Sequence, residues 1–363
     1  MDKISTGNLI KRVKSNKNAS EISHLSRRQF LIGAAVISLF GPDLRAKVET
    51  SKVVRIGGLD FSNALTTVVN LKSAVIQGIA ALIGKPQDTI PWNQIFPSAK
   101  NVSMKIDTRS PLAATKGELI SALLELLYDH NIDPWKVTVW DKRIADIRSR
   151  GYDLKTKIGK HEVTATELTN QPKNAETGYN SRRAYKPKDT LEQTEGMEKK
   201  PDQSASYITN LIPGARTTLI NVPTPKHNPL TGIDGALFSL ATGSFSNTAR
   251  FHESSEKMIE SIVGLLKMKP FSNRILTIMD ATDYVFEGGP VGLPAWKAQD
   301  NSLFIGFDPV AVDAVALEMI DRKRVEVDLP SIAEAGSALL TAAEEAGLGS
   351  KKPELIRLQS SRN

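Results

Sequence analysis

Short apolar runs alternate with longer segments of helical spacing in the first part of the chain. Three runs are typical of buried strands: residues 52–59, 102–106 and 137–140. Two segments between them carry apolar residues at helical spacing: residues 62–83 and 115–129. Thr115 and Glu118 match a capping box at the start of the second helix. This order of strand, helix and strand indicates the βαβ unit of a parallel sheet.

The same alternation returns after residue 206. Further strands are predicted at residues 217–222, 274–279 and 302–307, and further helices at residues 253–267 and 308–319. We therefore predict an α/β fold with mostly parallel or mixed sheets flanked by helices. The chain is expected to form two lobes, residues 47–141 and 206–350, followed by a tail at residues 351–363.

Residues 142–205 differ in composition from both predicted lobes. They are rich in Lys, Arg, Glu, Asn, Gln and Thr and contain few large apolar residues. Such a segment buries too little apolar surface to offset the entropy of ordering it. We predict a polar, partly flexible surface excursion here, with residues 181–202 as its most mobile part.

Residues 1–46 have the layout of a twin-arginine export leader. The motif Ser26-Arg27-Arg28-Gln29-Phe30-Leu31 leads into an apolar core that ends before Gly41-Pro42. The core has about 11 residues, whereas a helix that spans a bilayer needs about 20. An ordinary secretory leader or an anchoring helix, with arginines there by chance, is one alternative. An uncut leader that acts as an anchor is another, because Leu44 weakens the cleavage site near Ala46. We expect the twin-arginine translocation machinery to export the folded chain to the periplasm or an equivalent extracytoplasmic compartment.

Charge and cysteine content exclude several functions. Residues 1–46 hold 8 of the 47 Lys and Arg residues and 3 of the 40 Asp and Glu residues, so the remainder has a net charge of only +2. A nearly neutral body argues against nucleic-acid binding, which needs a clustered basic face. The chain has no cysteine, which excludes disulfides, Cys-held iron–sulfur clusters and covalent haem. No run of 18 apolar residues follows the leader, so we expect no permanent membrane span in the mature chain.

Polar side chains follow three predicted strands: Asp141, the Lys226-His227-Asn228 loop and Asp280. Ligands of open α/β sheets bind outside the carboxyl ends of the strands. Glycines near these carboxylates would let the backbone approach a ligand, although a turn-rich connection explains them as well. The candidate ligand-binding residues are Asn228, Asp280, Asp283, Gly288, Gly289, Gly292 and Asp308.

Lys226, His227 and Asp313 are the candidate catalytic residues. Asp313 lies in a helix that is apolar nearly all round, so its carboxylate needs either a partner or a raised pKa. A structural hydrogen bond is the alternative for Asp313, and a helix N-cap before Pro309 is the alternative for Asp308. His227, His252 and Asp280 lack a spacing typical of metal ligands, so the metal and the cofactor stay open.

Several motifs occur in an order that suggests a family. They are Ile220-Asn221-Val222-Pro223 with Lys226, Thr231-Gly232-Ile233, Asp280-Ala281, Gly289-Pro290 with Gly292, Asp308-Pro309-Val310-Ala311-Val312-Asp313, and Ala346-Gly347-Leu348-Gly349. Together they resemble the domain-of-unknown-function family 362 over roughly residues 100–350. The resemblance implies a fold and a site rather than a reaction, because the family has no agreed activity.

Two further implications of the resemblance concern chemistry. Many relatives carry a Cys-rich ferredoxin-like segment, and its absence here excludes an iron–sulfur redox role. Relatives tend to have Lys-x-His in the proline-rich loop, whereas this chain has Lys226-His227-Asn228. A Lys-Asn pair that is usual after the Thr-Gly segment is replaced by Phe238-Ser239.

Two functional hypotheses follow. The first is an exported α/β protein, an enzyme or a carrier, that binds a small anionic or carbonyl-bearing molecule or a non-covalent cofactor. The second is a non-catalytic accessory protein that assembles an envelope redox complex through residues 142–205.

Overall fold

The structure is a computed structural model. It describes residues 51–61, 64–97, 100–166, 178–185, 205–212, 214, 217–271 and 275–360. The predicted export leader at residues 1–46 lies outside the described residues.

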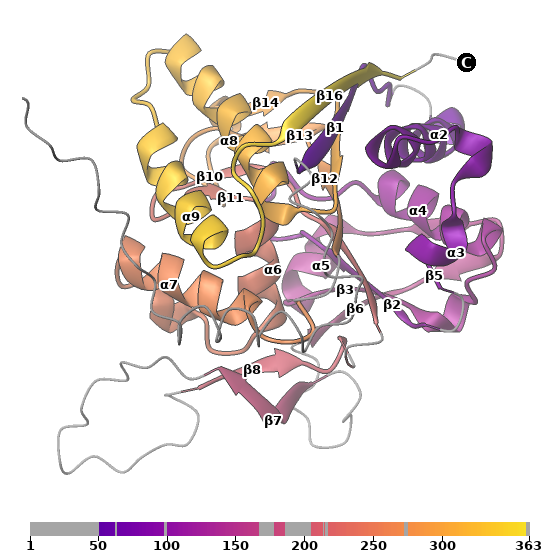
Figure 1. The fold of residues 1–363 in the computed structure, drawn as a ribbon, viewed down its shortest axis with the longest axis horizontal. Coiled ribbons are helices and arrows are strands. Elements are labelled where there is room, and N and C mark those ends of the chain that lie inside the picture. The colour runs from indigo at the N-terminus through magenta and orange to yellow at the C-terminus, as the bar shows by residue number, and fades with distance from the viewer. Residues whose placement is uncertain are drawn as a thin grey trace, which may run out of the picture. The chain divides into compact units, whose positions relative to one another are not determined.

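An eight-stranded sheet organises the described residues (Figure 1), in the order β16-β1-β15-β12-β9-β2-β3-β6. Its strands are β1 (Lys52–Gly57), β2 (Val102–Ile106), β3 (Val137–Asp141), β6 (Val163–Ala165), β9 (Thr218–Val222), β12 (Ile275–Asp280), β15 (Leu303–Gly306) and β16 (Glu354–Gln359). Only β15 pairs antiparallel with its neighbours, so the carboxyl ends of the other strands lie along one edge of the sheet.

Helices cover both faces of this sheet (Figure 1). Helices α2 (Ala64–Ile83) and α4 (Gly117–Asp129) pack on one face. The other face carries α6 (Ala236–Ser244), α7 (Ser255–Leu266), α8 (Pro309–Glu326) and α9 (Ala333–Glu345). Because strand side chains alternate, Met104 of β2 packs toward α2 and α4, whereas Ser103 and Lys105 point to the opposite side.

Smaller elements complete the described part of the chain. A second sheet has the order β11-β10-β13-β14. Its strands are β10 (Lys226–Asn228), β11 (Gly232–Asp234), β13 (Asp283–Val285) and β14 (Lys297–Gln299). The remaining elements are α3 (Trp92–Ile95), α5 (Ile144–Arg150), β4 (Leu154–Thr156), β5 (Gly159–His161), β7 (Tyr179–Tyr185) and β8 (Ser206–Thr209), with short 3-10 turns at Gln87–Thr89, Pro134–Lys136, Ala249–Phe251 and Pro294–Trp296. No helix in the described ranges is both long enough and apolar enough to cross a bilayer.

The α/β fold class is confirmed, and most predicted elements occur within a few residues of their expected bounds. The sequence pattern missed α6, because all of its residues are buried and it therefore has no polar face to create a helical period. The pattern also gave no signal for α9. The predicted capping box is wrong: Lys116 is the N-cap of α4, and the Thr115 hydroxyl donates to the Val222 carbonyl, 2.7 Å away.

Strands from both predicted lobes belong to the same sheet. Strand β2, from residues 47–141, pairs along its whole length with β9, from residues 206–350. The expected tail contains β16, which pairs with β1. Within residues 142–205, β6 extends the main sheet beside β3, while residues 167–177 and 186–204 lie outside the described residues.

Strands β2 and β9 form a topological switch point. The chain leaves β2 through α4, on one face, and continues to β3. It leaves β9 through α6 and α7, on the opposite face, and continues to β12. Connections that diverge in this way open a crevice at the carboxyl ends of the two strands, which is the usual ligand position in such sheets.

Candidate functional site

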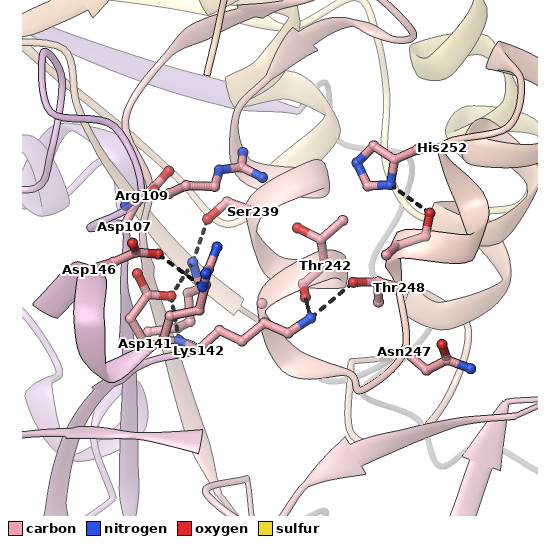
Figure 2. A pocket seen from close by; sticks show the side chains of 14 residues that line it. Asp107, Arg109, Asp141, Lys142, Asp146, Ser239, Thr242, Asn247, Thr248 and His252 are labelled. Atoms are coloured by element: carbon pink, nitrogen blue, oxygen red, sulfur yellow. Dashed lines mark hydrogen bonds and ion pairs between the residues drawn. The ribbon is translucent and has the colours of Figure 1, made fainter. Parts of the chain in front are cut away.

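A pocket of about 300 Å³ lies at this edge of the sheet (Figure 2). Its lining residues come from four segments: 105–109 at the end of β2, 141–146 at the end of β3, 239–243 of α6, and 247–252. The volume is at the lower end of the range for small-molecule sites. Charged side chains occupy the β2 and β3 side, and hydroxyl groups occupy the α6 side.

A buried ion pair lies directly beneath the pocket. The Lys226 Nζ atom is 2.5 Å from Asp107 Oδ2, and it also donates to the carbonyl and the hydroxyl of Thr224, each at 2.8 Å. Burial lowers the pKa of Lys226 to about 8, although Asp107 opposes the shift. Burial alone would raise the pKa of Asp107, but the Lys226, Lys105 and Arg109 cations outweigh it and hold that pKa well below its usual range.

A second ion pair forms the floor of the pocket. Lys105 Nζ lies 3.3 Å from Asp141 Oδ1 and donates to Ser239 Oγ at 2.6 Å. The other oxygen of Asp141 accepts hydrogen bonds from the Thr108 backbone N–H and hydroxyl, at 2.8 and 2.7 Å. Strand β2 therefore places a buried lysine between the sheet and α6. Lys105 connects the end of β3, through Asp141, to α6, through Ser239.

Two further cations connect the pocket walls. Arg109 forms an ion pair with the fully buried Asp234, and its guanidinium lies 5.1 Å from the centre of the Phe238 ring. Lys142 Nζ donates to the Thr242 carbonyl at 2.8 Å and to the Thr248 hydroxyl at 2.9 Å (Figure 2). These contacts fix the positions of α6 and of residues 247–252 relative to β2 and β3.

The charges of the pocket and of its direct partners nearly balance. The cations are Lys105, Arg109, Lys142, Arg143 and Lys226. The carboxylates are Asp107, Asp141, Asp146 and Asp234. Burial raises the pKa of Asp146, and Arg143, 3.8 Å away, opposes that shift. With every one of these groups ionised, the site carries one net positive charge.

The structure separates the three predicted catalytic residues. Lys226 reaches the pocket only through Asp107, because its own side chain is 0 % exposed. His227 points to the other side of β10, where its Nδ1 atom lies 3.7 Å from Glu287 Oε1 and burial lowers its pKa. Asp313 accepts hydrogen bonds from the Ala236 and Leu237 backbone N–H groups at the start of α6, at 2.5 and 2.9 Å.

The predicted ligand-binding carboxylates make structural hydrogen bonds. Asp280 accepts from Lys116 N and from Thr282, on the face of the sheet that carries α4. Asp283 accepts from Lys116, Lys297 and Gln299. Asp308 caps α8 through Val310 N and Ala311 N, and it also accepts from Ser350 N at 2.7 Å.

The remaining predicted residues shape loops. Asn228 Oδ1 accepts from Leu230 N and Thr231 N within a turn. Gly288 and Gly292 have φ values of 61° and 65°, which favour glycine. A side chain at Gly289 would collide with the His227 carbonyl. None of these residues lines the pocket.

Sequence reasoning missed Lys105, Asp107, Arg109 and Ser239. A signal for the first three was present: a lysine interrupts the buried run of β2, and Asp107 and Arg109 follow at intervals of two, which places all three on one face of an extended chain. Asp141 was correctly noted at a strand end, and it lines the pocket. Of the three possible metal ligands considered from the sequence, His252 lines the pocket, whereas His227 and Asp280 do not. The described residues contain no cluster of three potential metal ligands.

The chain matches the model of a known protein family. The family described as "Domain of unknown function (DUF362)" matches residues 102–318, more than half of the chain. The matched region begins at β2, ends within α8, and includes every segment that lines the pocket. No curated protein and no solved structure matches this chain.

We expect Lys226→Met to destabilise the protein by about 3–5 kcal/mol, because Asp107 would stay buried without its countercharge. Urea unfolding measures the loss. Lys72→Met is the matched control: it removes a partly exposed lysine that pairs with Glu125 and Asp129, and we expect a loss of about 0–1 kcal/mol. Adding Asp107→Asn to Lys226→Met should recover part of the stability, and equal losses for Lys226→Met and the control would contradict the assignment.

Asp313 should make stability depend on pH. Burial raises its pKa from 3.8 to about 7, although the two backbone N–H donors oppose the shift. The folded protein therefore binds this proton more tightly than the unfolded chain, and the resulting stabilisation is lost as the pH rises from about 4 to about 7. We expect the stability of the wild type relative to Asp313→Asn to fall by an amount on the order of 4 kcal/mol across this window. Denaturant unfolding at several pH values tests this, and a flat difference would contradict it.

Proposed function

We propose that this chain, which belongs to the DUF362 family of unknown function, binds a small anionic solute in the pocket at the carboxyl ends of β2 and β3. The observation that carries the proposal is a set of lysine and arginine side chains that ion pairs and hydrogen bonds hold around the pocket at the switch point of the sheet. Ligands of open α/β sheets bind at such points.

Preorganisation supports a binding function. Lys105 and Arg109 each have a carboxylate partner, so their positions do not depend on a ligand. A site whose cations are already fixed loses little conformational entropy when an anion arrives. The net charge of +1 favours an anion over a cation, and the hydroxyl groups of Ser239 and Thr248 add hydrogen-bonding capacity.

Binding can be measured with two probe anions, inorganic phosphate and malonate, by isothermal titration calorimetry on the purified chain. We expect Lys142→Met to weaken binding about 10- to 100-fold, because a hydrogen bond between charged groups is worth about 1.5–3 kcal/mol. Lys142 suits this test because it lines the pocket and donates across it, to the Thr242 carbonyl and to the Thr248 hydroxyl.

Lys52→Met is the control for this experiment, because Lys52 lies on β1, outside the pocket, and is 41 % exposed along its side chain. Its affinity should equal that of the wild type. If neither probe binds, and deletion of residues 186–204 instead removes the cellular function, the accessory-protein hypothesis replaces this proposal.

We also propose that the protein works on the far side of a membrane, after export in folded form. The support is the arginine pair at Arg27 and Arg28 before a short apolar core. Replacing both arginines by lysine should leave the protein in the cytoplasm, as judged by cell fractionation. A matched double change at Lys11 and Arg12, outside the motif, should leave export intact. Normal export of the Arg27→Lys, Arg28→Lys variant would indicate an ordinary secretory leader instead.

A further inference from the structure

The contact between Lys105 and Ser239 has a defined direction. A lysine ammonium has three donors and no acceptor, so in the 2.6 Å contact Ser239 Oγ must accept the hydrogen bond. The proton of the Ser239 hydroxyl then points away from Lys105. Ser239 is therefore a polarised donor, because the ammonium draws electron density from its oxygen.

In the described part of the chain, no neighbouring group accepts a hydrogen bond from the Ser239 hydroxyl. The Ser239 backbone N–H donates to the Gly235 carbonyl at 3.0 Å, but the Ser239 hydroxyl donates to no group among the described residues. Thr242, one turn later in α6, differs: its hydroxyl donates to the Phe238 carbonyl at 2.8 Å. Since Ser239 lines the pocket, its hydroxyl can donate to a molecule bound there.

The surrounding structure fixes Lys105 in this position. Its side chain extends from the middle of the sheet and is almost completely buried, with Asp141 3.3 Å from the ammonium. Gly243 gives it room, because a Cβ atom at this position would lie 2.5 Å from Lys105 Cε. The lysine side chain thus packs against α6 at Gly243, and its ammonium reaches the Ser239 hydroxyl.

We propose that Ser239 and Lys105 form an oxyanion subsite, in which the Ser239 hydroxyl donates to a carboxylate or phosphate oxygen of the bound solute. Lys105 is the positioning residue, since it orients and polarises the hydroxyl. This inference rests on the proposed function and adds to it the chemical group that the pocket recognises. Hydrogen bonds to an ionised acceptor are short and roughly twice as strong as those between neutral groups.

The test compares Ser239→Ala with the wild type, again by calorimetry with inorganic phosphate and with malonate. We expect Ser239→Ala to weaken binding of the preferred probe about tenfold or more, in a variant that circular dichroism shows to be folded. Ser244→Ala is the matched control: Ser244 is a buried serine of the same helix whose hydroxyl has no hydrogen-bond partner among the described residues, and it lies outside the pocket. The Ser244→Ala variant should bind the preferred probe with the affinity of the wild type. The stronger probe identifies the bound group as a phosphate or a carboxylate.

The two proposals fail in different ways. If the wild type binds neither probe, the proposed function fails, and the subsite fails with it. If the wild type binds and Ser239→Ala binds equally well, only the subsite is overturned.

A second measurement needs no variant. A fluorophosphonate reagent should leave wild-type Ser239 unlabelled, because Lys105 donates to this oxygen and does not remove its proton. Stoichiometric labelling of Ser239, detected by mass spectrometry, would show instead that Lys105 acts as a base, and it would overturn the assignment.

Discussion

Lys226 and Asp107 bring a positive and a negative charge together at almost completely buried positions, and the arrangement of the pocket depends on this pair. Removing two ions from water costs several kcal/mol each, which only close contact and additional hydrogen bonds can offset. Thr224 supplies those additional bonds through its carbonyl and hydroxyl. The pair therefore holds the segment after β9 against the end of β2, at the point where the connections of the sheet diverge.

Helix α6 forms the other wall of the pocket, and polar contacts hold it in place. Its first turn is held by Asp313, its middle by the contact between Ser239 and Lys105, and the strand before it by the ion pair between Asp234 and Arg109. A helix that is buried on every side gains its position from packing, but packing alone does not fix its rotation. The polar contacts on several sides supply that constraint, since a slip by one residue would leave charged groups unpaired.

Most residues of the family motifs stabilise the structure around the pocket and do not line it. Asp308 caps α8 and holds Ser350 beside the Ala346-Gly347-Leu348-Gly349 segment, so two motifs that are far apart in sequence form one structural unit. Asp313, in the same motif as Asp308, anchors α6. Motif matching therefore identified carboxylates whose partners are backbone amides, while the pocket itself is lined by residues such as Lys105 and Arg109 that no motif included.

Local pattern determined most of the secondary structure, the α/β class and the edge of the sheet where polar groups collect, because the period of apolar residues reports burial along one element. It could not reveal α6, whose burial has no period. It also could not give the strand order, which pairs β2 with β9 across more than a hundred residues and brings Lys226 to Asp107. Only the tertiary structure decided which strand ends meet: alternation along β12 turns Asp280 toward α4, whereas Asp107 and Asp141 line the pocket. Which distant side chains lie close together depends on sheet order and on side-chain direction, and neither is a property of a single segment.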